Sequence, residues 1–155
     1  MKQSPEEKKL EDLLRSTAIV AGGFMGTDPR HPADVIQEDI LETEKRGFTP
    51  AQLAQRMHEL TELAKPYLGC WVETCRGKIR VKTEEFKGAL ICPWPHPGLF
   101  DKRVTAAERL DTGEKIQWTD LNIHLIAEHS FFEGRGAFFR IEPAEIIRIL
   151  FEGLT

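Results

Sequence analysis

The stretch Lys78-Ile79-Arg80-Val81-Lys82-Thr83 decides the fold class. Basic side chains alternate with apolar or β-branched ones, and this period of two is typical of a strand with one solvated and one buried face. Residues 71–75 precede it across Arg76-Gly77, so the two segments are predicted to pair as an antiparallel hairpin. The centre of the chain is therefore expected to be a β-sheet.

A second hairpin is expected around the turn Asp111-Thr112-Gly113. Apolar residues alternate before this turn, from 104 to 110, and after it, from 116 to 118. Residues 88–92 are apolar enough to add a further strand. The sequence thus predicts a mostly antiparallel sheet made of two hairpins.

Helical patterns lie on both sides of this sheet in the sequence. Pro32 opens one helix that ends before Gly47, and Thr49 caps another that runs to about Lys65, so we expect an N-terminal helical hairpin. A buried helix capped by Thr119 and a C-terminal helix from residue 143 follow the sheet. Because helices and strands are segregated along the chain, the fold class is α+β.

The composition bounds the organisation and the partners. A chain of 155 residues with 41% hydrophobic residues is expected to form one domain over 1–155, in which 1–15 forms an N-terminal helical arm. A net charge of −4 argues against binding to nucleic acid or to an anionic membrane, and no apolar stretch approaches the roughly 20 residues of a membrane span. The start of the chain is charged, unlike a signal peptide.

The cysteines point to a reducing compartment. Cys70, Cys75 and Cys92 are an odd number in a chain without secretory features, so a cytoplasmic location is expected. Cys70 and Cys75 have no matching pair downstream and are expected to be buried as small hydrophobic residues.

The most informative segment for chemistry is the helix from Asp120 to His129, which is apolar around most of its circumference. Asp120, His124 and Glu128 lie at i, i+4 and i+8, so two carboxylates flank one imidazole along a narrow seam. This arrangement suits a catalytic acid–base centre, with the three residues as its members, or a buried hydrogen-bonded network. The sequence leaves open whether the protein is an enzyme.

A stiff loop, Cys92-Pro93-Trp94-Pro95-His96-Pro97-Gly98, offers further candidates. Cys92 and His96 would complete a four-ligand zinc set with His124 and His129, although the spacing is not that of a common zinc motif. Since these two helix histidines are five residues apart, we expect them to converge only if the helix ends between them. Trp94 is expected either to contact a ligand or to fill the core.

A third feature is the segment 131–140, which holds four phenylalanines, two glycines and two arginines. Arg135 and Arg140 are candidates for binding an anionic group, and the phenylalanines are expected to be core residues on either side of a glycine turn. Single-stranded nucleic acid could use this loop together with the face of Lys78, Arg80 and Lys82, but the acidic net charge disfavours that.

These observations lead to two functional hypotheses. The first is a His-centred site, with zinc as the candidate metal, that binds a small anionic ligand. The alternative is a non-enzymatic protein-binding or assembly domain in which the His/Asp/Glu cluster is structural and the proline loop contacts a protein partner.

Overall fold

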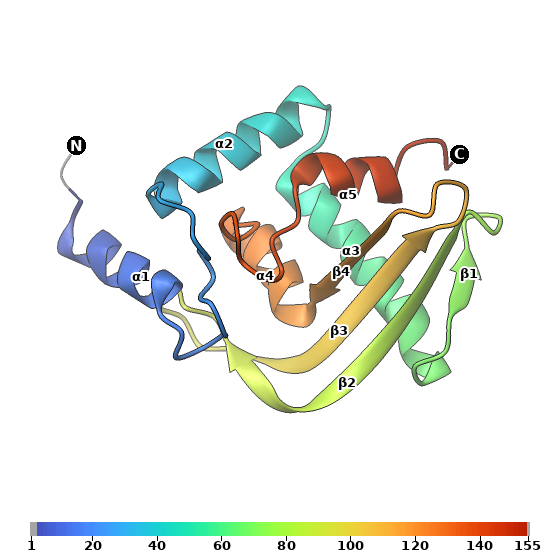
Figure 1. Cartoon of the computed structure of the whole chain (residues 1–155), viewed down its shortest axis with the longest axis horizontal. Coiled ribbons are helices and arrows are strands. Elements are labelled where there is room, and N and C mark those ends of the chain that lie inside the picture. Colours follow the sequence, from blue (N-terminus) through green and yellow to red (C-terminus); the bar gives the residue numbers. More distant parts are fainter. Residues whose placement is uncertain (1–2, 155) are drawn as a thin grey trace.

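The computed structural model describes residues 3–154 and confirms the α+β class. Its sheet is antiparallel, with the strand order β1-β2-β3-β4 (Figure 1). The strands are β1 (Val72–Thr74), β2 (Ile79–Ile91), β3 (Leu99–Arg109) and β4 (Lys115–Thr119). Both predicted turns, at Arg76-Gly77 and at residues 111–113, connect neighbouring strands, so the two expected hairpins are present.

The separate strand expected at 88–92 is wrong, because these residues continue β2 as far as Ile91. β2 and β3 pair along their whole length, but the register shifts between Glu85 and Ala89. Glu85 pairs with Arg103 and Ala89 with Asp101, so three residues of β2 lie opposite Lys102 alone. Such a bulge bends a hairpin, and Figure 1 shows the two long strands curving towards α1 at their far end.

Helices flank this sheet in the order that the sequence predicted. Those before it are α1 (Pro5–Arg15), α2 (Pro32–Lys45), α3 (Pro50–Ala64) and the short 3-10 helix η1 (Lys65–Tyr67). Those after it are α4 (Asp120–His129) and α5 (Pro143–Leu150). The connection between α2 and α3 is short, as expected, but each packs chiefly elsewhere: α3 lies against α4 and β2, and α2 lies against α5.

Local capping explains where two of the helices begin. Thr49 and Gln52 form a capping box at the start of α3, and Thr119 and Asn122 form another at the start of α4. In α4 the Thr119 hydroxyl accepts a hydrogen bond from the backbone N–H of Asn122 at 3.0 Å, and the Asn122 side chain accepts one from the backbone N–H of Thr119 at 2.8 Å. This cap fixes the start of the helix that carries two of the candidate histidines.

Two apolar clusters stabilise the molecule. The first lies between α3, α5 and the sheet and includes the buried Trp118, whose indole N–H donates to the Thr61 hydroxyl at 2.9 Å. The second lies under the far end of the long hairpin and includes Leu14 of α1, Leu125 of α4 and Cys92. Trp94 packs against this second cluster, so the proline loop is attached to the body of the protein through apolar contacts.

Some burial expectations are wrong. Cys70 is exposed and Cys75 is only half-buried, because Cys70 follows a turn and the Cys75 sulfur accepts a hydrogen bond from the Arg56 guanidinium. Phe131 and Phe132 are core residues as expected, whereas Phe138 is 76% exposed. Within residues 3–154, none of the helices combines the length and the apolar character needed to cross a membrane.

Candidate metal centre

Four side chains from two elements meet at the far end of the long hairpin. Cys92 and His96 come from the loop between β2 and β3, and His124 and His129 come from α4. One potential ligand atom from each residue lies within 4.8 Å of the corresponding atoms of the other three. The structure therefore brings together the four residues that the sequence analysis grouped as a zinc set.

The imidazole of His96 lies at the centre of the group. Its Nε2 atom is 3.1 Å from Nε2 of His129 and 3.2 Å from Nε2 of His124. The Cys92 sulfur is 3.5 Å from Nε2 of His129. Three imidazole nitrogens and one thiol thus face a common point.

The two helix histidines converge although the helix does not end between them. α4 continues to His129, and Ser130 then leaves the helix in a left-handed conformation with φ 52°. Residues five apart on a helix point about 140° apart, so neither side chain lies directly over the other. The two rings nevertheless meet edge to face with centroids 5.2 Å apart, and His96 contacts both, which the spacing alone could not show.

Aromatic contacts fix the orientation of the rings. Trp94 stacks on His129 with ring centroids 4.1 Å apart and planes 9° apart, and it also meets the edge of Phe131 at 5.5 Å. Phe100, at the start of β3, lies against His124 at 4.4 Å. Phe100 was not among the predicted site residues, since a single phenylalanine in a strand carries no signal for such a role.

The proline loop orients His96 through its own backbone. The N–H of His96 donates to the Trp94 carbonyl at 2.8 Å, and Nδ1 of His96 lies 3.1 Å from the Pro97 carbonyl oxygen. Because a carbonyl oxygen only accepts hydrogen bonds, Nδ1 carries the proton of the neutral ring. The lone pair is then on Nε2, which faces the other two histidines.

The histidines of α4 are held in their neutral forms. The pKa of His129 is lowered to about 4, first by burial and then by the nearby rings of His124 and His96. The pKa of His124 also lies below its ordinary value, again first because of burial. Glu128 acts in the opposite direction on both rings but does not outweigh these effects. Burial raises the pKa of the Cys92 thiol.

The carboxylate seam predicted around His124 is not assembled as expected. Asp120 forms an ion pair with Arg103 of β3, and the same guanidinium binds Glu85 at 2.9 Å. The second carboxylate oxygen of Asp120, Oδ1, is buried and has no hydrogen-bond partner among the described residues. Glu128 is exposed and affects the histidines only through its charge. His124 therefore belongs to the Cys/His group rather than to an Asp–His–Glu row.

The two candidate anion-binding arginines lie in other environments. Arg140 is buried and paired with Asp39 and Glu142, and one of its N–H groups donates to the Glu133 carbonyl at 2.9 Å. Arg135 is exposed, and its backbone N–H donates to the Asp28 carboxylate at 3.0 Å. Within residues 3–154, no hydrogen bond or ion pair of either arginine goes to the Cys/His group. Of the predicted ligand-contacting residues, only Trp94 adjoins this group.

The basic face of the sheet is also compensated. Arg80 pairs with Glu108 and lies over the Trp71 ring at 4.2 Å, and Lys82 pairs with Glu84. Two of the three basic side chains that a nucleic acid would need on this face therefore have carboxylate partners, and the Lys78 ammonium group donates to the Gly153 carbonyl.

No family model, no curated protein and no solved structure matches this chain. The chemistry of the four-residue group is therefore argued from its own geometry.

Proposed function

We propose that the protein binds one Zn²⁺ ion through Cys92, His96, His124 and His129, and that the ion joins the tip of the β2–β3 hairpin to the end of α4. The observation that carries the proposal is the convergence of one thiol and three imidazoles, all with their ligand atoms within 4.8 Å of one another. Thiolate and imidazole are the donors that zinc prefers, and Cys₁His₃ is a set of the size that closed zinc sites use.

The distances support tetrahedral coordination. Zn–N bonds of about 2.0–2.1 Å place two donor nitrogens about 3.3 Å apart in a tetrahedron, and a Zn–S bond of about 2.3 Å places sulfur about 3.5 Å from nitrogen. The corresponding separations here are 3.1 and 3.2 Å between nitrogens and 3.5 Å between sulfur and nitrogen. Three of the six pairs of ligand atoms thus have separations close to those of a tetrahedron, and the other pairs lie within 4.8 Å.

The hydrogen-bonding capacity of the group favours a cation at its centre. The single lone pair of His96 Nε2 faces two other Nε2 atoms at similar distances, and it can accept only one good hydrogen bond. A central cation would accept a lone pair from each of the three rings and from the Cys92 sulfur. It would also ionise this buried thiol, as bound metals do.

A closed set of four protein ligands favours a structural ion over a catalytic one, because catalytic zinc keeps one position open for water or substrate. A small anionic molecule at this centre would have to displace one of the four donors, and Arg140 is already paired with two carboxylates. We therefore favour the hypothesis in which the cluster is structural and non-enzymatic.

The test is a zinc titration of chelator-treated protein against a chromophoric competitor. We expect one ion per chain for the parent and for His58→Ala, a matched control because His58 is exposed on α3. His124→Ala and His96→Ala should each lower the affinity for zinc by more than about 100-fold. Loss of a residue that only hydrogen-bonds to a metal ligand already costs about 10–100-fold.

Cobalt substitution reports the ligand set directly. The Co²⁺ form should show the strong visible bands of tetrahedral coordination and a near-ultraviolet thiolate band that disappears in Cys92→Ser. Failure to bind one metal ion, or an equal loss of affinity in His58→Ala, would overturn the proposal.

A further inference from the structure

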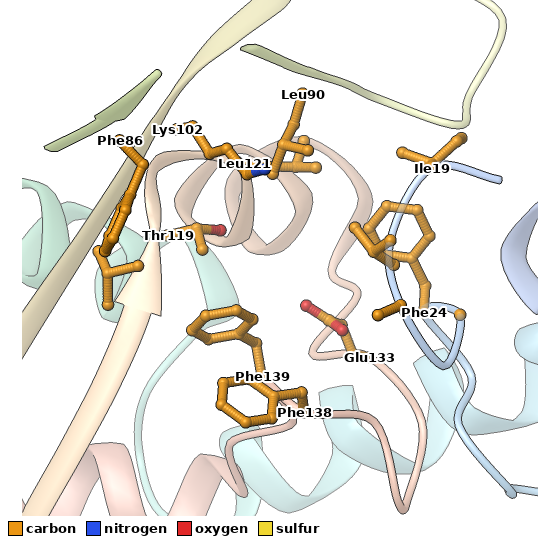
Figure 2. A pocket seen from close by; sticks show the side chains of 14 residues that line it. Ile19, Phe24, Phe86, Leu90, Lys102, Thr119, Leu121, Glu133, Phe138 and Phe139 are labelled. Atoms are coloured by element: carbon orange, nitrogen blue, oxygen red, sulfur yellow. The ribbon is translucent and has the colours of Figure 1, made fainter. Parts of the chain in front are cut away.

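A second candidate site lies in a cavity of about 370 Å³ beside the bend of the long hairpin (Figure 2). Four separate segments enclose it: residues 19–24, the bulged part of β2 and β3, the start of α4 with its cap Thr119, and residues 133–139. Its size falls in the range of small-molecule sites, roughly 300–1,000 Å³. None of the four metal-site residues lines it.

The walls of this cavity are mainly apolar. Leu90 and Leu121 line it from β2 and α4, and Phe24 lines it from the segment before α2. Two large aromatic side chains of its lining, Phe86 and Phe138, are 52% and 76% exposed. Phe86 belongs to the three bulged residues opposite Lys102, so the register shift of the sheet contributes directly to this wall.

One buried carboxyl group is directed into the cavity. Glu133 is only 4% exposed, and Figure 2 shows its carboxyl group between Phe24 and Phe139. The Asn122 amide donates to its Oε2 atom, while its Oε1 atom has no hydrogen-bond partner within residues 3–154. Oε1 is not fully enclosed by protein atoms, and Glu133 lines the cavity, so we infer that Oε1 faces the cavity.

The backbone of Glu133 adopts a conformation that is rare for a residue with a side chain. Its φ is 68°, in the left-handed region, and such residues are held in place by the surrounding structure. The next residue, Gly134, donates its N–H to the Phe24 carbonyl at 2.8 Å, and a Cβ there would lie 2.5 Å from the Met25 carbonyl oxygen. The close contact with the 24–25 backbone thus fixes the turn that carries the carboxyl group.

The environment of Glu133 favours its neutral form. Burial raises its pKa to about 8, although the Asn122 hydrogen bond and the charge of Arg140 act in the opposite direction. Because Oε2 accepts from Asn122, the proton of the neutral acid belongs on Oε1, where it can be donated into the cavity. Lys102 also lines the cavity and disfavours a positively charged ligand.

We propose that this cavity binds a small, uncharged and largely apolar molecule with a carbonyl-type acceptor, to which Oε1–H of Glu133 donates a hydrogen bond. Apolar walls with one placed polar group are the usual composition of small-molecule sites. The inference is independent of the metal centre, because the two sites share no residue.

The test uses 6-propionyl-2-dimethylaminonaphthalene, a neutral ketone whose emission shifts to the blue in apolar surroundings. Ala21→Trp fills the cavity from an exposed lining position, and Ala33→Trp adds the same side chain at an exposed position of α2 outside the cavity. We expect the ketone to bind saturably, with blue-shifted emission, to the parent and to Ala33→Trp. Its affinity for Ala21→Trp should be at least about tenfold lower.

The hydrogen bond is tested with 2-dimethylaminonaphthalene, which lacks the ketone. The parent should prefer the ketone by up to about tenfold, the upper range for one hydrogen bond. Glu133→Met should abolish this preference. Should that variant not fold, the parent itself provides the measurement, because the preference for the ketone should disappear above about pH 9, where Glu133 is ionised.

Three results would overturn the proposal. The first is no saturable binding of the ketone, and the second is an equal affinity for the two naphthalenes at about pH 7. The third is that dodecanoate displaces the probe from the parent but does not bind Lys102→Ala. The site would then be one for an anionic amphiphile.

Discussion

Trp94 and His129 lie face to face, with ring centroids 4.1 Å apart and planes 9° apart. One half-buried aromatic residue of the proline loop thus holds a candidate metal ligand of α4, and Phe131 supports the same indole from the side. Apolar packing therefore orients the ligand before any ion binds, which reduces the ordering cost of binding.

Replacing Trp94 should weaken zinc binding without changing its stoichiometry. We expect Trp94→Ala to lower the affinity by about 10-fold, because a support that orients a ligand is lost while all four donors remain. Trp71→Ala is the matched control, since Trp71 is also half-buried but contacts Arg80 and Lys82. Competition titrations measure both, and an equal loss in the two variants would contradict this role.

Zinc should raise the stability of the folded protein. A ligand that binds only the folded state at 100 times its Kd adds about 2.7 kcal/mol to the free energy of unfolding. Thermal unfolding with added zinc and with a chelator should therefore show a clear difference in Tm for the parent and for His58→Ala. The same comparison in His124→Ala should show little difference, and an equal shift there would point to binding elsewhere.

The stability of the protein should depend on the ionisation of Glu133. Its pKa is about 8 in the folded state against an ordinary value of 4.5, so between these values the unfolded chain releases a proton that the folded chain keeps. The contribution of Glu133 is therefore fully present below about pH 4.5 and is lost as the pH rises towards about 8.

Glu133→Gln should remove this pH dependence. The free energy of unfolding of Glu133→Gln, compared with that of the parent, should increase from about pH 5 to about pH 8. This difference should grow by at most about 1.4 kcal/mol per pH unit. Urea unfolding at several pH values measures the difference, with the exposed Glu59→Gln as control. Parallel curves for the parent and Glu133→Gln would show that the carboxyl group ionises normally.

The two arginines of the 131–140 segment should respond very differently to substitution. Arg140→Ala leaves the buried Asp39 carboxylate without its partner, which is expected to cost about 3–5 kcal/mol. Arg135→Ala removes an exposed side chain and keeps the backbone bond to Asp28, so it should change stability by less than about 0.5 kcal/mol. Equal losses in urea unfolding would contradict this assignment.

Local signals in the sequence predicted most of the fold. Pro32, Thr49 and Thr119 marked helix starts that the structure confirms, and the period of two from residue 78 identified the first hairpin. The bulge opposite Lys102 could not be predicted, because a register shift depends on which residues of two strands pair. Beyond the bulge, residues 89–91 extend β2 because they pair with residues 99–101 of β3.

The residue types of the Cys/His group were identifiable from the sequence, but their geometry was not. His124 and His129 share no helix face, yet their rings meet with centroids 5.2 Å apart, and His96 joins them from a loop 28 residues before His124. The partner of Asp120 was misassigned for a similar reason, since Arg103 lies on a strand and matches no helical spacing. Contacts between distant segments decided both outcomes.

The hairpin tip has one more consequence. Leu90 lines the cavity and Cys92, two positions later, belongs to the metal group, so both proposed sites restrict the same short piece of backbone. If each ligand binds the ordered form of this piece better, the two are thermodynamically linked, and each must raise the affinity of the other by the same factor. The zinc concentration in the cell would then influence the affinity of the cavity for its apolar ligand.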